Sequence, residues 1–152
     1  MQSIESAKGR ALLFLKFRPR SEAELKRRLS QLGYGAETVD QVVAEFKAKG
    51  LVDDEKFARY FAQSQMNVKP AGRRALAASL KAKGIGSELA AQAVEIAVDG
   101  KEDLEIAREL ARKRIGSFRD LEPEVVQRRL FGYLSRRGFA SDVVYKVVRE
   151  IV

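Results

Sequence analysis

The chain has 152 residues, of which 45% are hydrophobic and 33% charged, and its 29 basic and 21 acidic residues give a formal net charge of +8. It contains no histidine and no cysteine, which excludes the commonest general base, the thiol nucleophile, the usual zinc ligands and any disulfide. No apolar run approaches the roughly 20 residues that cross a bilayer, and no cationic leader precedes a long apolar stretch. We therefore expect a soluble protein that is not exported and has no membrane contact, and the excess positive charge favours a polyanionic partner.

The first part of the chain is predicted to form three helices, at residues 3–17, 21–32 and 36–49. Pro19 ends the first, because proline disfavours helical backbone in the residue before it. Ser21 opens the second in a capping box with Glu24, whose carboxylate can reach back to the amide of Ser21. Gly33 follows the second helix, where a left-handed cap costs glycine little.

Six more helices are predicted in the rest of the chain, at residues 53–66, 72–83, 87–98, 101–115, 123–137 and 141–152. The first of these begins with Asp53, Asp54 and Glu55, whose negative charges suit the positive end of a helix. Pro70 lies near the start of the next helix, where its missing amide costs nothing. No alternating apolar and polar run is flanked by hairpin turns, so we expect no sheet.

The same pattern around a glycine occurs three times, at Gly33, Gly84 and Gly138. Leucines stand eight and four residues before each glycine: Leu25 and Leu29, Leu76 and Leu80, and Leu130 and Leu134. Apolar residues follow at six, nine, ten and thirteen positions downstream, as on one face of a helix. Two amphipathic helices joined by a glycine turn explain this pattern, which recurs after 51 and 54 residues. We predict an all-α fold of three tandem three-helix repeats, at residues 1–50, 51–100 and 101–152.

Basic residues concentrate mostly in the middle helix of each predicted repeat. The candidate binding residues are Lys26, Arg27, Arg28, Arg73, Arg74, Lys81, Lys83, Arg128, Arg129, Arg136 and Arg137. If the basic helices line up on one side, these residues form a discontinuous positive stripe. A solvated face explains any one cluster as well, but it accounts less well for the recurrence in corresponding segments. Aromatic residues do not interleave with the clusters at a stacking spacing, which disfavours a platform for stacked bases.

Two features suggest ligand chemistry but are better explained by helix ends. The glycine pairs at 33 and 35 and at 84 and 86 resemble phosphate loops, yet both follow helices rather than strands. The carboxylates at 53–55 are oxygen ligands by type, yet their place at a helix start already explains them. The chain also lacks a Gly-x-x-x-x-Gly-Lys phosphate loop. We therefore expect no metal, no cofactor and no enzymatic activity.

Six short segments follow one another along the chain: 18–25 (RPRSEAEL), 33–34 (GY), 50–58 (GLVDDEKFA), 72–74 (GRR), 80–85 (LKAKGI) and 136–139 (RRGF). Together these segments resemble the RecX family of recombination regulators. Each segment is short, but their order and intervals make the match specific over nearly the whole chain. Ser79 departs from the pattern, since many relatives carry glutamate there, and the third helix of the second repeat is rich in alanine.

The resemblance implies a bacterial cytoplasmic protein whose three repeats form an elongated, curved array. It also implies a partner, because RecX proteins bind the RecA recombinase in the groove of its filament on single-stranded DNA. Members generally suppress filament growth, ATP hydrolysis and strand exchange. On this interpretation the chain is a monomeric regulator of DNA repair, homologous recombination and the SOS response, and its basic residues contact the filament.

A second class of function is an autonomous DNA-binding protein, because three-helix units with a glycine turn resemble tandem helix-turn-helix modules. It predicts salt-dependent binding to bare single- or double-stranded DNA. The helices at 36–49 and 87–98 disfavour it, since their outer faces are neutral or acidic and offer few side chains for reading bases. A helical scaffold for another protein partner is a third alternative.

Overall fold

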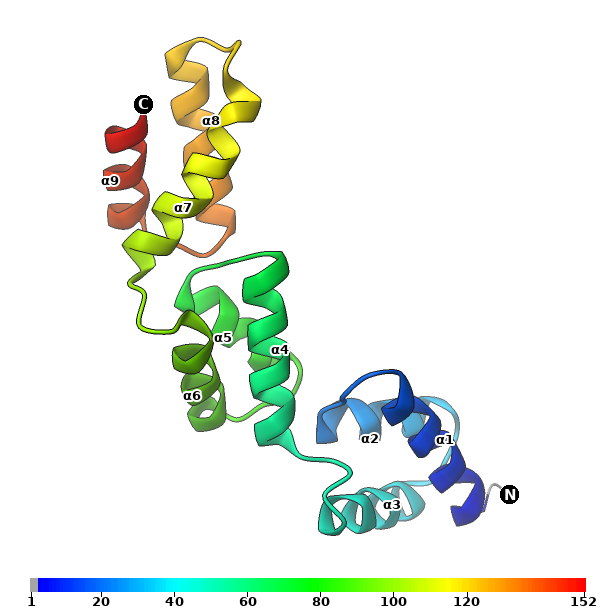
Figure 1. Ribbon diagram of the computed structural model, residues 1–152. Coiled ribbons are helices and arrows are strands. Elements are labelled where there is room, and N and C mark those ends of the chain that lie inside the picture. The colour runs from blue at the N-terminus through cyan, green and yellow to red at the C-terminus, as the bar shows by residue number, and fades with distance from the viewer. Residues whose placement is uncertain (1–2) are drawn as a thin grey trace. The chain divides into compact units, whose positions relative to one another are not determined.

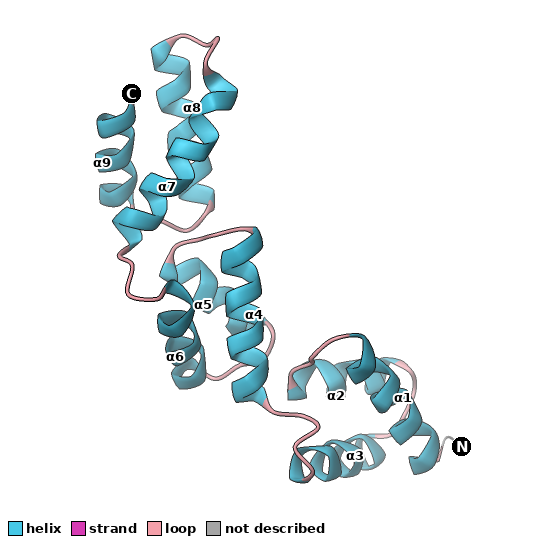
Figure 2. Cartoon of the chain, viewed as in Figure 1, coloured by secondary structure: helices cyan, strands magenta, loops and turns pink. Residues whose placement is uncertain are grey.

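The computed structural model describes residues 3–152, in which helices are joined by short loops (Figures 1 and 2). Within this range the α-helices are α1 (Ile4–Phe17), α2 (Glu22–Gln31), α3 (Ala36–Ala48), α4 (Asp54–Val68), α5 (Arg73–Ala82), α6 (Ser87–Val98), α7 (Asp103–Ile115), α8 (Pro123–Arg136) and α9 (Ser141–Ile151). No strand interrupts the described residues, and the predicted all-α class is confirmed. None of the helices described here is long and apolar enough to span a bilayer.

Side-chain caps explain where two of the helices begin. Ser21 Oγ accepts the N–H of Glu24 at 3.1 Å, and the carboxylate of Glu24 accepts the N–H of Ser21 at 3.2 Å. The predicted capping box of α2 is therefore confirmed. Asp53 Oδ1 accepts the N–H groups of Glu55 and Lys56 at 3.0 and 3.2 Å, so this carboxylate caps α4 as its position predicts.

The three glycines of the repeated pattern stop the middle helices. Gly33, Gly84 and Gly138 have φ angles of +94°, +86° and +86°, a region that residues with a Cβ rarely adopt. After Gly84, the N–H of Ile85 returns to the carbonyl of Leu80 at 3.1 Å and closes the helix end. The predicted glycine turns are thus confirmed.

The first helix of the third predicted repeat ends at Ile115 as predicted, but its start differs from the prediction. It begins at Asp103, two residues late, because Glu102 is the extended N-cap residue with φ −78° and ψ 154°. Beyond its end the chain continues as a short 3-10 helix, Gly116–Phe118, which places Phe118 in the interior. The apolar ring of Phe118 explains why the chain stays coiled there, since burying it removes a large apolar surface from water.

The chain groups into two compact units, which divide it differently from the three predicted repeats. The first unit holds residues 3–61, as far as they are described, together with 80–93, and the second holds 62–79 and 94–152. Helices α4, α5 and α6 each contribute to both units. The repeat boundaries at residues 50 and 100 stay a prediction, as does the elongated, curved array.

The core of the first unit follows from the predicted apolar spacing. Ala7 and Ala11 of α1 are fully buried, and their small side chains allow neighbouring helices to approach closely. Leu25 and Leu29 of α2 and Val42 of α3 pack in the same cluster, each at most 1% exposed. Burying each such leucine contributes about 1.5–3 kcal/mol relative to exposure.

The second unit repeats this arrangement in α7, α8 and α9. Ala107 and Ala111 of α7 are fully buried, as are Leu130 and Leu134 of α8 and Val144 of α9. These residues match the small residues, leucines and valines of the first unit's core. Each three-helix core therefore combines an alanine-lined first helix with a leucine-bearing middle helix.

In each unit, a residue just before one middle helix donates a hydrogen bond to the carbonyl of the residue just after the next middle helix. In the first unit, Ser21 Oγ donates to the carbonyl of Lys83 at 2.6 Å. In the second, the N–H of Gly72 donates to the carbonyl of Arg137 at 2.9 Å. Ser21 stands twelve residues before Gly33, and Gly72 stands twelve residues before Gly84, the glycines of their own predicted repeats. The acceptors, Lys83 and Arg137, directly precede the glycines of the next repeats, Gly84 and Gly138. We call this arrangement the repeat joint.

A glycine–alanine contact completes each repeat joint. A Cβ added to Gly84 would overlap the Cβ of Ala23, and one added to Gly138 would overlap the Cβ of Ala75. A Cβ on Gly72 would lie 2.7 Å from the carbonyl oxygen of Gly138. The joints thus need glycine for close approach as well as for the turn.

Replacing Ser21 with alanine is expected to lower the free energy of unfolding by about 2–3 kcal/mol, because a partly buried amide and a partly buried carbonyl both lose their partner. Ser21 is fully buried and binds both the N–H of Glu24 and the carbonyl of Lys83. The control is Ser3→Ala, which removes an exposed cap on Ser6 and should cost about 1 kcal/mol. Urea unfolding of both variants measures the difference, and equal losses would contradict the joint.

Candidate functional site

The cations proposed as binding residues all lie on, or just after, the middle helices α2, α5 and α8. The structure separates them into two sets. Four make contacts within the fold: Lys26, Arg73, Lys83 and Arg137. The others are exposed and form what we call the exposed cation set: Arg27, Arg28, Arg74, Lys81, Arg128, Arg129 and Arg136.

Arg73 is the most tightly held of the proposed residues. Its guanidinium binds Glu95 at 2.8 Å, Asp103 at 3.0 Å and the carbonyl of Lys101 at 2.6 Å. The hydrogen bond with Glu95 is the main cause that raises the pKa of Arg73. Its contacts connect the start of α5 to α6 and α7, so this arginine has a clear structural role.

Lys83 and Lys26 also have carboxylate partners. Lys83 Nζ lies 3.6 Å from Glu24 and 5.9 Å from the ring centroid of Phe61. Lys26 Nζ lies 3.4 Å from Glu22 on the same helix. These pairs neutralise part of the positive charge that the sequence places on the middle helices.

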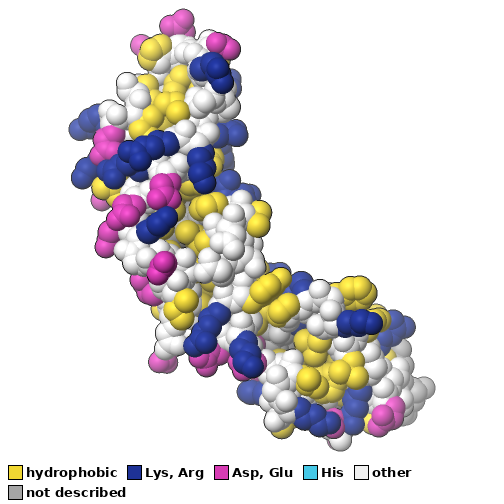
Figure 3. All heavy atoms as spheres, in the orientation of Figure 1, with side chains coloured by type: hydrophobic (Ala, Val, Ile, Leu, Met, Phe, Trp, Pro, Cys, Tyr) yellow, Lys and Arg dark blue, Asp and Glu magenta, His cyan; other side chains and the backbone are white. Residues whose placement is uncertain are grey.

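The exposed cation set keeps its charge uncompensated at short range. Within each residue's own unit, no carboxylate lies within 4.0 Å of any member. Arg28 packs its guanidinium 5.3 Å from the ring centroid of Phe14, which orients it while leaving it solvent-accessible. Figure 3 shows Lys and Arg side chains spread over the visible face, among apolar ones. Unpaired arginines and lysines can bind carboxylates or phosphates without first breaking an internal ion pair.

Arginine–aromatic stacking is the feature that the sequence interpretation missed. In the second unit, Tyr133 has the guanidinium groups of Arg114 and Arg137 each 5.2 Å from its ring centroid. These rings contact guanidinium groups of the protein itself, and the absence of a platform for stacked bases stays a prediction. The spacing of four residues between Tyr133 and Arg137 on one helix was a visible signal, whereas Arg114 comes from α7.

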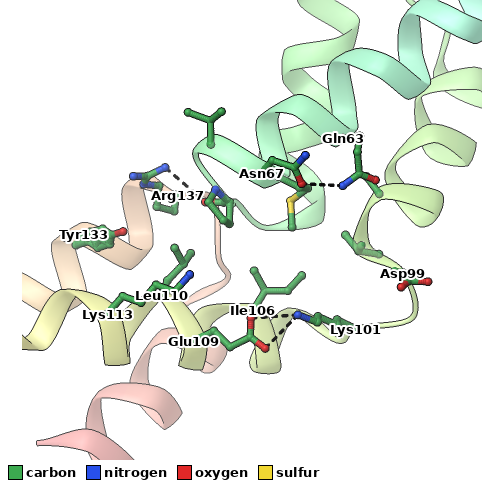
Figure 4. Close-up of a pocket in the computed structure, with 15 residues that line it drawn as sticks. Gln63, Asn67, Asp99, Lys101, Ile106, Glu109, Leu110, Lys113, Tyr133 and Arg137 are labelled. Atoms are coloured by element: carbon green, nitrogen blue, oxygen red, sulfur yellow. Dashed lines mark hydrogen bonds and ion pairs between the residues drawn. The ribbon is translucent and has the colours of Figure 1, made fainter.

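Tyr133 and Arg137 border a cavity of about 600 Å³ in the second unit, drawn in Figure 4. Its polar side chains are largely engaged with one another. Lys101 binds Glu109 at 3.1 Å, and Gln63 donates to Asn67 at 3.0 Å. Arg137 Nη1 also donates to the carbonyl of Pro70 at 3.4 Å. These contacts make the cavity a structural feature of the second unit rather than an assembled acid–base site.

Glu24 is the most constrained carboxylate of the first unit. Arg18 Nη1 donates to it at 3.2 Å, and the N–H of Ser21 donates at 3.2 Å. Burial alone would raise the pKa of Glu24, but the hydrogen bonds from Arg18 and Ser21 and the charge of Lys83 lower it. The contacts at the start of α2 therefore stabilise the ionised form of Glu24.

Acidification should weaken the first unit through Glu24. Because folding lowers its pKa, ionised Glu24 stabilises the fold above the unfolded pKa of about 4.3, and this contribution is lost as the pH falls through the folded value. Between about pH 6 and pH 3, the free energy of unfolding measured with urea should fall less steeply with decreasing pH for Glu24→Gln than for the parent chain. Glu37→Gln, at an exposed position of α3, is the control. An unchanged slope in Glu24→Gln would contradict the assignment.

Three family models match consecutive parts of the chain. They describe the first, second and third three-helix domains of RecX and match residues 7–46, 53–94 and 101–148. Two solved structures share the fold. The crystal structure of RecX from Lactobacillus salivarius aligns with a TM-score of 0.77 at 21% identity, over 97% of this chain and 96% of its own. A crystal structure of regulatory protein RecX aligns with a TM-score of 0.80 at 22% identity, over 97% and 73%.

Curated relatives extend the match to sequence. The regulatory protein RecX of Amycolatopsis mediterranei is 35% identical over 149 residues, which cover 98% of this chain and 85% of the relative. That of Thermobifida fusca is 34% identical over 144 residues, covering 95% and 77%. The segments that suggested the resemblance are thus part of a similarity over nearly the whole chain, and the chain belongs to the RecX family of regulatory proteins.

Proposed function

We propose that the chain is a non-enzymatic regulator that binds the RecA recombinase filament on single-stranded DNA and inhibits its extension, ATP hydrolysis and strand exchange. Membership of a family of regulatory proteins supports a regulatory role. The observation that carries the finer proposal is the exposed cation set, which recurs on α2, α5 and α8 without carboxylate partners in its own unit. A filament loaded with DNA offers the acidic side chains and phosphates that such cations bind.

Repetition suits a polymeric partner. Three copies of a similar helix–turn–helix arrangement carry cations at related places, so one chain can hold several neighbouring sites of a repeating filament. Once one repeat is bound, the others bind at a high effective concentration, and weak single contacts add up to strong binding. The chain then inhibits by occupying the filament. It is a cytoplasmic monomer that blocks filament growth or strand exchange and catalyses no reaction of its own.

The test is ATP hydrolysis by a RecA recombinase on saturating single-stranded DNA, with this protein titrated in and bare DNA added as a competitor. We expect hydrolysis to fall at substoichiometric protein and the competitor not to relieve the fall. No fall in hydrolysis would contradict the proposal. A fall that spare DNA abolishes would instead show that the protein sequesters DNA.

That last outcome corresponds to the second candidate, an autonomous DNA-binding protein. The exposed cation set favours it as well, since cations without carboxylate partners in their own unit can bind the phosphates of bare DNA. Its signature is binding to bare DNA that weakens steeply as salt rises, because displaced counterions drive the association. Binding to bare DNA measured over a range of salt separates the two candidates independently of the recombinase.

A further inference from the structure

A hollow in the first unit collects exposed apolar side chains. It has a volume of about 550 Å³ and lies among the end of α1, the loop after α3 and the start of α4. Phe17, Leu51 and Tyr60 line it and are 76%, 47% and 46% exposed. Figure 3 shows apolar side chains reaching the surface in the region of α1–α3. Exposed apolar side chains gathered in one hollow offer a place where an apolar group of a partner can be buried.

These exposed side chains contribute little to the core of the first unit. Phe17 is the last residue of α1 and contributes almost nothing to the core, while Phe57 beneath the hollow is 1% exposed and stacks on Phe61 with ring centroids 5.7 Å apart. Pro19 forms part of the wall and stiffens the chain beyond Phe17. The hollow therefore has a rigid apolar floor and exposed apolar sides.

The rim of the hollow is positively charged. Lys16, Arg20 and Lys56 line it, and within the first unit no carboxylate lies within 4.0 Å of these three. Asp53 is the acidic residue of the lining, and its carboxylate already caps α4. Burial lowers the pKa of Arg20, and the charge of Arg18 lowers it further, as expected where positive charges gather.

We propose that this hollow binds an acidic peptide segment of a partner protein. A large apolar side chain of the peptide enters between Phe17, Leu51 and Tyr60, and carboxylates on either side of it face the three cations of the rim. Apolar contact supplies the affinity, and the opposite charges set the orientation. The inference goes beyond the proposed function, because it does not require the partner to be the RecA recombinase.

A strand of nucleic acid fits the hollow less well. Its bases would stack on Phe17 or Tyr60, but their polar edges would then lie against aliphatic walls such as Leu15 and Leu51. The lining includes no serine, threonine, asparagine or glutamine, so only its charged side chains could bind those edges. An apolar peptide side chain has no such edges to satisfy, so the chemistry of the walls favours the peptide.

The cavity of the second unit shown in Figure 4 provides an internal comparison. Val68 and Pro70 line it two residues apart at the end of α4, as Phe17 and Pro19 do at the end of α1. Val68 is 85% exposed, yet its surroundings include paired polar side chains such as Lys101 with Glu109. Substituting Val68 thus removes an equally exposed apolar residue from a more polar site.

The test uses the full chain and a short labelled peptide of aspartate and glutamate with one central phenylalanine. In an NMR titration at low salt, we expect saturable shifts of the backbone amides that line the hollow. Phe17→Ala and Lys56→Glu should each raise the dissociation constant about tenfold, whereas Val68→Ala should leave it unchanged. Because all three side chains are exposed, the variants should fold like the parent chain.

Two further probes complete the experiment. A peptide with alanine in place of phenylalanine, and one with lysine in place of the acidic residues, should both lose most of the binding. The inference is overturned if the acidic peptide produces no saturable shifts, if the lysine peptide binds as well, or if Phe17→Ala has no effect. Binding of an oligothymidine that depends on Phe17 and exceeds that of the peptide would assign the hollow to nucleic acid instead.

Discussion

Replacing Gly84 with alanine is expected to lower the free energy of unfolding by about 2–4 kcal/mol, the largest stability loss that we predict for a single methyl group. Two causes add. Gly84 has a φ of +86°, where an alanine is strained by about 1–2 kcal/mol. In addition, the new Cβ would overlap the Cβ of Ala23 and push apart the contact on which the first unit's repeat joint depends. Urea unfolding followed by circular dichroism measures the loss.

Two further variants separate these causes. Gly50→Ala introduces the same type of strain, since φ is +74°, but the added Cβ meets nothing within 4 Å and should cost only about 1–2 kcal/mol. Adding Ala23→Gly to Gly84→Ala removes the overlapping methyl group and should recover about 1–2 kcal/mol as a coupling energy in a double-mutant cycle. If the two substitutions are simply additive, the close approach of Gly84 to Ala23 is not what makes the glycine necessary.

Reversing the charge of Arg27 and Lys81 together should weaken inhibition of the recombinase about tenfold or more, because repulsion replaces attraction at two places in the interface. Both residues belong to the exposed cation set of the first unit, and no carboxylate of that unit lies within 4.0 Å of either. Arg27→Glu with Lys81→Glu therefore breaks no internal ion pair of that unit. The protein concentration that halves ATP hydrolysis on single-stranded DNA is the measurement.

The matched control reverses two exposed cations outside the middle helices, Arg10 of α1 and Lys146 of α9. It changes the net charge equally, so it should weaken inhibition only slightly. Equal weakening in both double variants would mean that inhibition follows total charge rather than the exposed cation set. Unchanged inhibition by Arg27→Glu with Lys81→Glu would remove these two residues from the proposed interface.

Local sequence was sufficient for the helices but not for the contacts between them. The capping box of Ser21 and Glu24 was visible because its partners are three residues apart. The second hydrogen bond of Ser21 was not, since its acceptor, Lys83, lies 62 residues away. The glycine turns were likewise predictable from Gly84, whereas the packing of its Cα against Ala23 depends on how two repeats meet.

The sequence predicted which basic residues belong to the candidate site, but not which of them are held in ion pairs and which are exposed. Arg73 and Arg74 are neighbours of the same charge, yet Arg73 is held by Glu95 and Asp103 while Arg74 is exposed. Composition and helical spacing cannot distinguish them, because the carboxylates that hold Arg73 come from other helices. The hollow beside Phe17 was also invisible in the sequence, since its walls come from three separate segments.

The repeat joint determines how this protein can be dissected. Residues 1–50 resemble a self-contained domain, but a fragment cut there would lose the carbonyl that Ser21 binds and the glycine that packs on Ala23. The first compact unit also includes residues 80–93, so a fragment that retains its interior must extend to residue 93. Cutting between adjacent repeats therefore yields incomplete pieces, and binding studies on single repeats would report on exposed joints rather than on native surfaces.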